Sequence, residues 1–137
     1  GRARQGSTRS PQWTHGGIAL GPKPRSYRTK LNKKVKQIAM FSALSAKVAN
    51  NEMVVVDAIV AESYSTKVMV NMLTAINAGK KTLVVLAEPD EKVVKSLANI
   101  ENVKVAYTNT INVYDLLRYQ KLVLTVDTIK KLEEVYA

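Results

Sequence analysis

The chain of 137 residues contains no cysteine and a single histidine, His15. Without thiols it can form no disulfide and offer no thiolate as a nucleophile or metal ligand, and one imidazole cannot build a metal site. Its longest apolar runs, such as residues 83–87, fall far short of the roughly 20 residues that a membrane-spanning helix needs. These absences exclude a disulfide scaffold and a thiol enzyme, and we expect no metal site and no membrane span.

Acidic residues are absent from the first third of the sequence. Residues 1–47 contain eleven Lys or Arg and no Asp or Glu, whereas residues 48–137 contain ten Lys or Arg and eleven Asp or Glu. The formal net charge of +10 is the sum of these two parts, +11 and −1. A wholly basic segment beside a nearly neutral one predicts a polyanionic partner, and nucleic acid is a better candidate than an acidic membrane surface.

Regular periodicity is absent from residues 1–31, which hold five of the six glycines and three of the four prolines. Pro22 and Pro24 favour extended backbone around them, and the pair Gly16-Gly17 permits a bend. We therefore predict two parts, an extended basic arm at residues 1–31 and a globular domain at residues 32–137.

A helix is predicted at the start of the domain, with Asn32 as its cap and its end near Val48. Lys33, Lys36 and Lys47 are assigned to the side away from its apolar stripe, so that one side of the helix can pack while another faces phosphate. The residues that we assign to the apolar stripe are Val35, Ile38, Ala39, Phe41, Ser42, Leu44 and Ala46.

The rest of the domain alternates between strand-like and helix-like segments. Runs of Val, Ile and Leu predict strands at 53–58, 82–87, 103–107 and 122–126, and helical patterns lie at 65–78, 90–99, 112–119 and 127–136. Near-continuous apolar strands separated by helices are typical of a parallel sheet covered on both faces. We predict an α/β fold, a three-layer α/β/α sandwich with a four-stranded parallel sheet.

A parallel sheet also suits a nucleotide-binding enzyme. However, the turn after the first predicted strand, residues 57–65, has no glycine for a phosphate loop, and the turn at residues 87–90 is acidic. Asp57 and Glu88 follow strands and could approach each other at the carboxyl edge of the sheet. Because no nucleophile, base or metal cluster accompanies them, we interpret them as helix caps or solvated acids. We predict no catalytic residue and no cofactor.

The arm carries side chains that suit RNA. Guanidinium groups bind phosphate oxygens in pairs, planar side chains stack on unpaired bases, and glycines let the backbone approach folded RNA. The alternatives are a solvated charged tail for the cations and packing against the domain for Trp13 and Tyr27. The candidate RNA-binding residues are Arg2, Arg4, Arg9, Gln12, Trp13, His15, Lys23, Arg25, Tyr27, Arg28 and Lys30 of the arm, with Lys33, Lys34 and Lys36 of the helix.

Several stretches of the sequence together carry a resemblance to a known family. They are residues 1–7 (GRARQGS), 10–13 (SPQW), 16–17 (GG), 21–27 (GPKPRSY), 33–34 (KK), 42–45 (SALS) and 130–134 (KKLEE). This pattern resembles the bacterial type of large-subunit ribosomal protein four, "L four", over the whole chain and more weakly after Val48. The sequence departs from the family pattern at Thr14, His15 and Asn32, where a basic residue, a glycine and a proline are common.

The resemblance implies a structural protein of cytoplasmic ribosomes and not an enzyme. It implies a globular domain on the outer side of the large subunit, with strand order 1-4-2-3, and a long loop that enters the large ribosomal RNA and reaches the nascent-peptide tunnel. The implied partners are that RNA, neighbouring ribosomal proteins and the nascent peptide. The implied loop-tip residues are Gly1, Arg2, Ala3, Arg4, Gln5 and Gly6.

Two further expectations complete this interpretation. We expect the chain to lack an N-terminal segment that family members have, which would supply the outgoing limb of the loop and the first elements of the domain. The alternative function is a free regulatory module that binds RNA or DNA, and a nucleotide-binding enzyme is a distant third.

Overall fold

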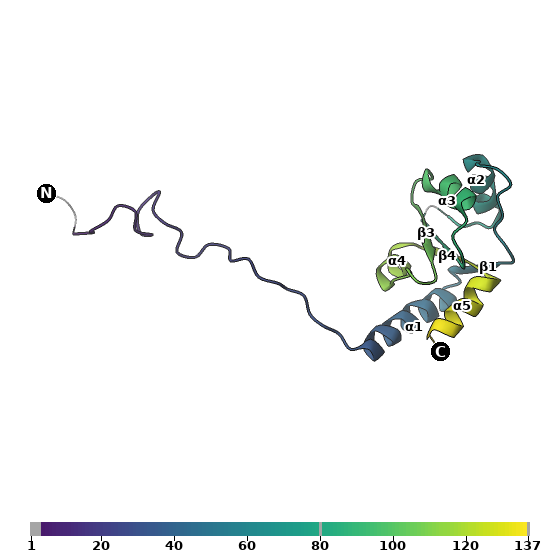
Figure 1. Ribbon diagram of the computed structural model, residues 1–137, viewed down its shortest axis with the longest axis horizontal. Helices are drawn as coiled ribbons and strands as arrows, with labels where there is room; N and C mark the ends of the chain where they lie inside the picture. The colour runs from purple at the N-terminus through teal and green to yellow at the C-terminus, as the bar shows by residue number, and fades with distance from the viewer. Residues whose placement is uncertain (1–3, 80, 137) are drawn as a thin grey trace. The chain divides into compact units, whose positions relative to one another are not determined.

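The structure is a computed structural model that describes residues 4–79 and 81–136 (Figure 1). The chain divides into two units, residues 1–30 and residues 31–137. Residues 4–30 contain no helix or strand, and the helices and strands of the described residues all lie in the second unit.

A four-stranded sheet forms the centre of the second unit. Its strands lie in the order β1-β4-β2-β3, and every neighbouring pair is parallel. Leu122 pairs with Met53 on one side and with Leu83 on the other, and Leu83 pairs in turn with Lys104. The predicted α/β fold, the all-parallel sheet and the implied strand order are thereby confirmed. The strands are β1 (Met53–Val56), β2 (Thr82–Leu86), β3 (Val103–Tyr107) and β4 (Lys121–Thr125).

Helices cover both faces of the sheet (Figure 1). Residues of α1, α4 and α5 share one buried cluster with Leu83 and Leu122, whereas residues of α2 and α3 share another with Val84 and Val123. Neighbouring strand residues point to opposite faces, so each strand contributes to both clusters. The five helices are α1 (Lys33–Ala49), α2 (Thr66–Ala75), α3 (Glu91–Ala98), α4 (Val113–Arg118) and α5 (Val126–Tyr136).

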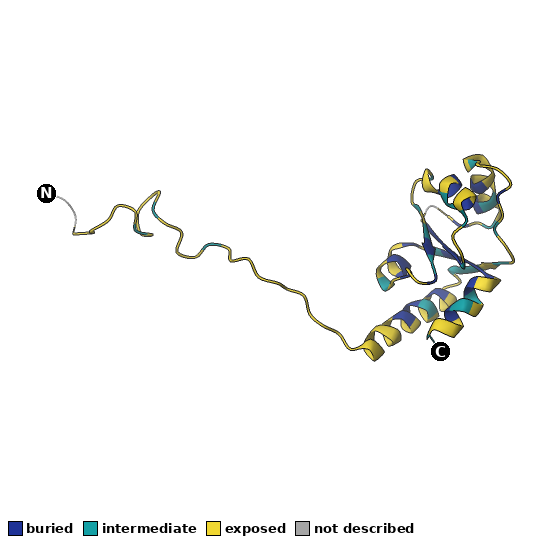
Figure 2. Ribbon diagram, viewed as in Figure 1, coloured by how far each residue is buried: buried dark blue, intermediate teal, exposed yellow. Residues whose placement is uncertain are grey.

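The core is centred on the two inner strands (Figure 2). All five residues of β2 are buried, and so are Leu122 to Thr125 of β4, whereas β1 and β3 are only partly buried. Full burial of a Val or Leu side chain contributes roughly 1.5–3 kcal/mol. The continuous apolar runs in the sequence therefore reflect burial on both faces at the middle of the sheet.

The predicted apolar stripe of α1 was wrong. The buried residues of α1 are Met40, Ala43 and Lys47, with Leu44 half-buried beside them, and they follow the helical spacing of three and four residues. Val35 and Ile38, which we assigned to the stripe, are exposed. The prediction placed apolar residues on the packed side and lysines on the other side. It failed because Lys47 lies in the same buried row as Met40 and Ala43.

Candidate nucleic-acid interface

Residues 5–17 of the first unit form consecutive tight turns. The Trp13 amide donates to the Ser10 carbonyl over 3.0 Å, and the Gly16 amide donates to the Trp13 carbonyl over 2.9 Å. The Gly17 amide closes the loop by donating to the Arg9 carbonyl, also over 2.9 Å. The sequence indicated a bend at the two glycines, but it did not predict this series of turns.

The residue at position 16 must be glycine for this loop to close. A Cβ atom on Gly16 would collide with the carbonyl oxygen of Ser10, which is backbone and cannot move aside alone. His15 beside it has a φ of 66°, in the left-handed region that few non-glycine residues adopt. The side chains of Gln5 and Gln12 also hydrogen-bond across the loop. Backbone packing therefore fixes the positions of the polar side chains between residues 5 and 17.

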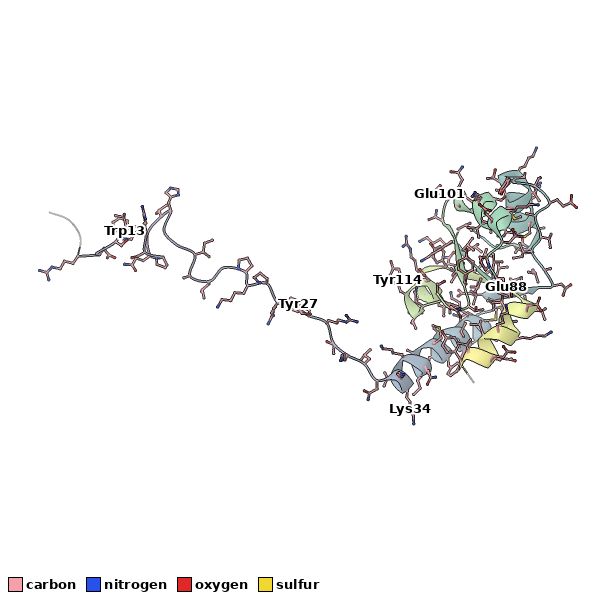
Figure 3. All side chains as sticks on the ribbon, in the orientation of Figure 1. Trp13, Tyr27, Lys34, Glu88, Glu101 and Tyr114 are labelled. Atoms are coloured by element: carbon pink, nitrogen blue, oxygen red, sulfur yellow. The ribbon has the colours of Figure 1, made fainter. Side chains whose placement is uncertain are left out.

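The proline-containing part of the first unit presents a cation and an aromatic ring together, and the ring is that of Tyr27, labelled in Figure 3. The guanidinium carbon of Arg25 lies 4.5 Å from the centre of the Tyr27 ring, within the range of a cation–π contact. The Tyr27 side chain is 77% exposed and Trp13 is 39% exposed. A base that stacked on the Tyr27 ring would have a guanidinium beside it for its phosphate.

The predicted contact residues of the first unit are exposed wherever the structure describes them. Because residues 1–47 contain no acid, these cations have no carboxylate partner within their own unit. Gly1, Arg2 and Ala3 of the implied loop tip lie outside the described residues, whereas Arg4, Gln5 and Gly6 lie inside them and are exposed. The other exposed candidates are Arg9, Gln12, Trp13, His15, Lys23, Arg25, Tyr27, Arg28 and Lys30.

The first turn of α1 places positive charge where a helix disfavours it. Lys33, Lys34 and Lys36 are all exposed there, the turn has no acidic residue, and Asn32 makes no side-chain capping hydrogen bond. The N-terminus of a helix carries a partial positive charge, so a cation near it costs about 0.3–1 kcal/mol. A bound phosphate would reverse this repulsion, since it would meet both the lysines and the free amide groups. The arrangement therefore favours an anionic partner at this end of α1.

Lys47, which we assigned to the phosphate-facing side of α1, is instead buried within the fold. Its ammonium group donates to Glu52 Oε2 over 2.6 Å, to the Tyr119 carbonyl over 2.8 Å and to the Gln120 carbonyl over 3.0 Å. Three acceptors satisfy the three N–H groups of the ammonium. Lys47 therefore joins α1 to the turn before β4 and is removed from the set of cations that can reach RNA.

The carboxyl edge of the sheet gathers acids around a cavity of about 160 Å³. Asp57, Glu88, Asp90 and Asp127 line it, so Asp57 and Glu88 do approach the same space. Asp90 caps α3 by accepting from the Lys92 amide over 2.9 Å, and Glu88 accepts from Lys131 over 2.7 Å. The Lys131 ammonium lowers the pKa of Glu88, first through the hydrogen bond and then through its charge.

The interpretation of Asp57 and Glu88 was helix caps or solvated acids, and of these two Glu88 forms an exposed ion pair with Lys131. Among residues 4–79 and 81–136, no three His, Cys, Asp or Glu side chains are arranged to hold a metal ion. An acidic edge also repels the phosphates of a nucleotide. In the same described ranges, no helix has both the length and the apolarity needed to cross a bilayer.

Comparison with known proteins gives a consistent match along the sequence. The model of the Ribosomal protein L4/L1 family matches residues 1–135. The chain is 53% identical to "Large ribosomal subunit protein uL4" of Ruminiclostridium cellulolyticum, 54% identical to that of Clostridium botulinum strain Loch Maree and 51% identical to that of Alkaliphilus oremlandii. Each match covers all 137 residues of this chain and 66% of the relative. The chain therefore belongs to the Ribosomal protein L4/L1 family, as its N-terminal motifs implied.

Proposed function

We propose that this chain is a structural constituent of the large subunit of cytoplasmic ribosomes and that it binds large-subunit ribosomal RNA without catalysing a reaction. The observation that carries the proposal is the acid-free stretch of residues 1–47, whose described cations are exposed except for Lys47. The names of the relatives, which are large-subunit proteins, support it. Neighbouring ribosomal proteins are further partners in this proposal.

In this proposal, charge supplies the affinity of the chain for RNA and shape supplies its selectivity. Cations of residues 1–36 displace counter-ions from RNA phosphates, and this release supplies most of the affinity. Arg25 with Tyr27, and Trp13 on its closed loop, offer planar surfaces for unpaired bases. The turns around Gly16 hold Trp13 in place and thereby add selectivity for one RNA shape.

Salt-resistant cosedimentation tests the structural role. The full chain should remain with large ribosomal subunits through a wash at moderate salt. Salt weakens the attraction between the basic arm and RNA phosphates, but folded RNA that encloses the arm still slows its release. The measurement is the fraction of chain that pellets with subunits before and after the wash. Complete release by salt, with retained binding to isolated RNA, would support a free regulatory RNA-binding module instead.

We also propose that residues 1–6 line the nascent-peptide tunnel. Arg4 is exposed, and Arg2 and Arg4 belong to the GRARQGS motif that implied the loop tip. Ribosomes that carry Arg2→Glu and Arg4→Glu should respond differently to macrolides and to stalling peptides, because two cations that line the tunnel become anions. Thermal unfolding of the variant should match that of the original chain. Unchanged drug response and unchanged stalling would remove residues 1–6 from the tunnel.

A further inference from the structure

The α4 helix is a rigid support for side chains that the domain itself does not use. It has only six residues, a length at which an isolated helix is not stable. Asn112 caps it by accepting from the Asp115 amide over 2.8 Å, and the buried Asp115 carboxylate accepts from Lys104 of β3 over 2.6 Å. Leu116 anchors its inner face in the core. The outer face is therefore held in a fixed position.

That outer face consists of an aromatic ring, an apolar side chain and a guanidinium group. Tyr114 is 67% exposed and Leu117 is 66% exposed. The Arg118 guanidinium lies 5.9 Å from the centre of the Tyr114 ring and 5.8 Å from that of Tyr119, and its Nη1 approaches the Tyr114 hydroxyl at 3.5 Å. The two rings hold the guanidinium in place while Tyr114 leaves much of its surface to solvent.

The neighbouring surface of α1 adds positive charge to this face. Met40 of α1 packs in the same cluster as Leu116 and Tyr119, and α4 lies beside α1 (Figures 1 and 3). Lys36 and Lys33 precede Met40 by four and seven residues, so they continue its row along the helix towards the N-terminus. Lys34 points to the other side of the helix. Lys33 and Lys36 thus extend the α4 surface, and Lys34 does not.

The carboxylate of α4 itself is neutralised. The only acid of α4 is Asp115, which is buried and paired with Lys104, and α1 contains no acid along its length. An exposed tyrosine beside a held arginine, in a locally positive field, matches the way in which proteins bind unpaired nucleotides. Protein partners also favour Tyr and Arg, but the unbalanced positive charge favours a polyanion.

We propose that Tyr114 and Arg118 of α4, with Lys33 and Lys36 of α1, form a second RNA contact on the domain, separate from the arm. An unpaired base stacks on Tyr114, Arg118 binds the adjacent phosphate, and the two lysines bind phosphates further along the strand. This inference rests on the proposed function, because it takes the RNA partner from there. It adds Tyr114 and Arg118, which charge counting along the sequence does not predict, since residues 48–137 have a net charge of −1.

The test separates stacking from charge by the dependence of binding on salt. The full chain is titrated against transcribed large-subunit ribosomal RNA of Clostridium botulinum, whose relative is 54% identical. Tyr114→Leu should weaken binding about tenfold at every salt concentration, because stacking releases no counter-ion. Arg118→Gln should weaken binding and also reduce the log-log salt slope by about 0.7–0.9, the contribution of one phosphate contact.

Conservative variants and a matched pair elsewhere provide the controls. Tyr114→Phe keeps the ring and should bind like the original chain, whereas Arg118→Lys keeps the charge and should preserve the salt slope. Tyr64, which precedes α2, and Lys95 of α3 form a similar exposed pair. The Lys95 ammonium lies 5.7 Å from the centre of the Tyr64 ring. Tyr64→Leu with Lys95→Gln should leave RNA affinity unchanged. Thermal unfolding of each variant confirms that the domain remains folded.

The possible failures point to different conclusions. If the α4 variants bind RNA like the original chain while arm variants lose affinity, the second contact is overturned and the proposed function stands. If they bind RNA normally but no longer assemble with a ribosomal protein, α4 is a protein interface and the inference is again overturned. If the original chain does not bind ribosomal RNA at all, both proposals fall together.

Discussion

Replacing Lys47 with methionine should lower the free energy of unfolding by about 2–4 kcal/mol. This is a large effect for the substitution of a single lysine, because Lys47 is buried. Methionine fills a similar volume but offers no donor to Glu52 or to the Tyr119 and Gln120 carbonyls. When one partner is removed from a buried, charge-assisted network, the remaining polar groups stay buried without a hydrogen-bond partner, which is unfavourable. Glu52 is partly exposed, so water offsets some of this loss and keeps the effect below the highest values of the range.

Urea unfolding of matched variants measures this effect. Lys34→Met on the exposed side of the same helix should change stability by no more than about 0.5 kcal/mol, as surface substitutions usually do. Adding Glu52→Gln to Lys47→Met should recover part of the loss, because no carboxylate is then left without its cation. Equal unfolding midpoints for Lys47→Met and Lys34→Met would show that the buried ammonium does not stabilise the contact between α1 and the turn before β4.

The sheet was predictable because burial on both faces, which stabilises its strands, also requires continuous apolar residues that are visible in the sequence. β2 is continuous in Leu and Val because both of its faces are covered, and Asp90 lies before α3 because it caps that helix. The strand order followed only from the family resemblance. The positions of the strands along the sequence do not determine which strands become neighbours, so hydrophobic periodicity could not predict the order 1-4-2-3.

Lys47 shows where sequence reasoning about the candidate site failed. Charged residues are rarely buried, so a lysine in a basic helix was assigned to the RNA-facing side. Its partners are the carboxylate of Glu52 and two carbonyls about seventy residues later in the chain, and nothing local predicts that contact. The row of three- and four-residue spacing through Met40, Ala43 and Lys47 was visible, but only tertiary contact makes it the buried one.

The α4 surface was missed for a different reason. A tyrosine and an arginine four residues apart are ordinary on a helix, and the net charge of the sequence is concentrated in the arm instead. Their significance comes from the burial of Asp115 and from the two tyrosine rings near Arg118, which the structure supplies. The turns at residues 5–17 were missed likewise, since the contact between Gly17 and Arg9 has no periodic signature.

Neutralising the arm should produce the largest change in RNA binding. Burial of Lys47 removes one of the eleven cations that the sequence places in residues 1–47, so ten are counted as able to meet phosphate. If about half of the ten do so, the log-log slope of affinity against salt should be roughly −4, at about 0.7–0.9 per contact. Substituting glutamine for all seven arm cations should reduce the slope to about −2 to −3, because Lys33, Lys36 and Arg118 remain at about 0.7–0.9 each. These seven residues are Arg2, Arg4, Arg9, Lys23, Arg25, Arg28 and Lys30.

A matched control separates local contacts from overall charge. Substituting glutamine for seven other cations, Lys67, Lys80, Lys81, Lys92, Lys95, Lys130 and Lys131, changes the net charge from +10 to +3, as the arm variant does. If RNA responds only to net charge, both variants should lose the same affinity and the same slope. Phosphate contacts by the arm predict that the control keeps a slope near −4, since counter-ion release depends on the charges that meet the RNA. Binding measured from low to moderate salt distinguishes the two results, and a control slope as shallow as that of the arm variant would show that overall charge, and not contact by the arm, sets the salt dependence.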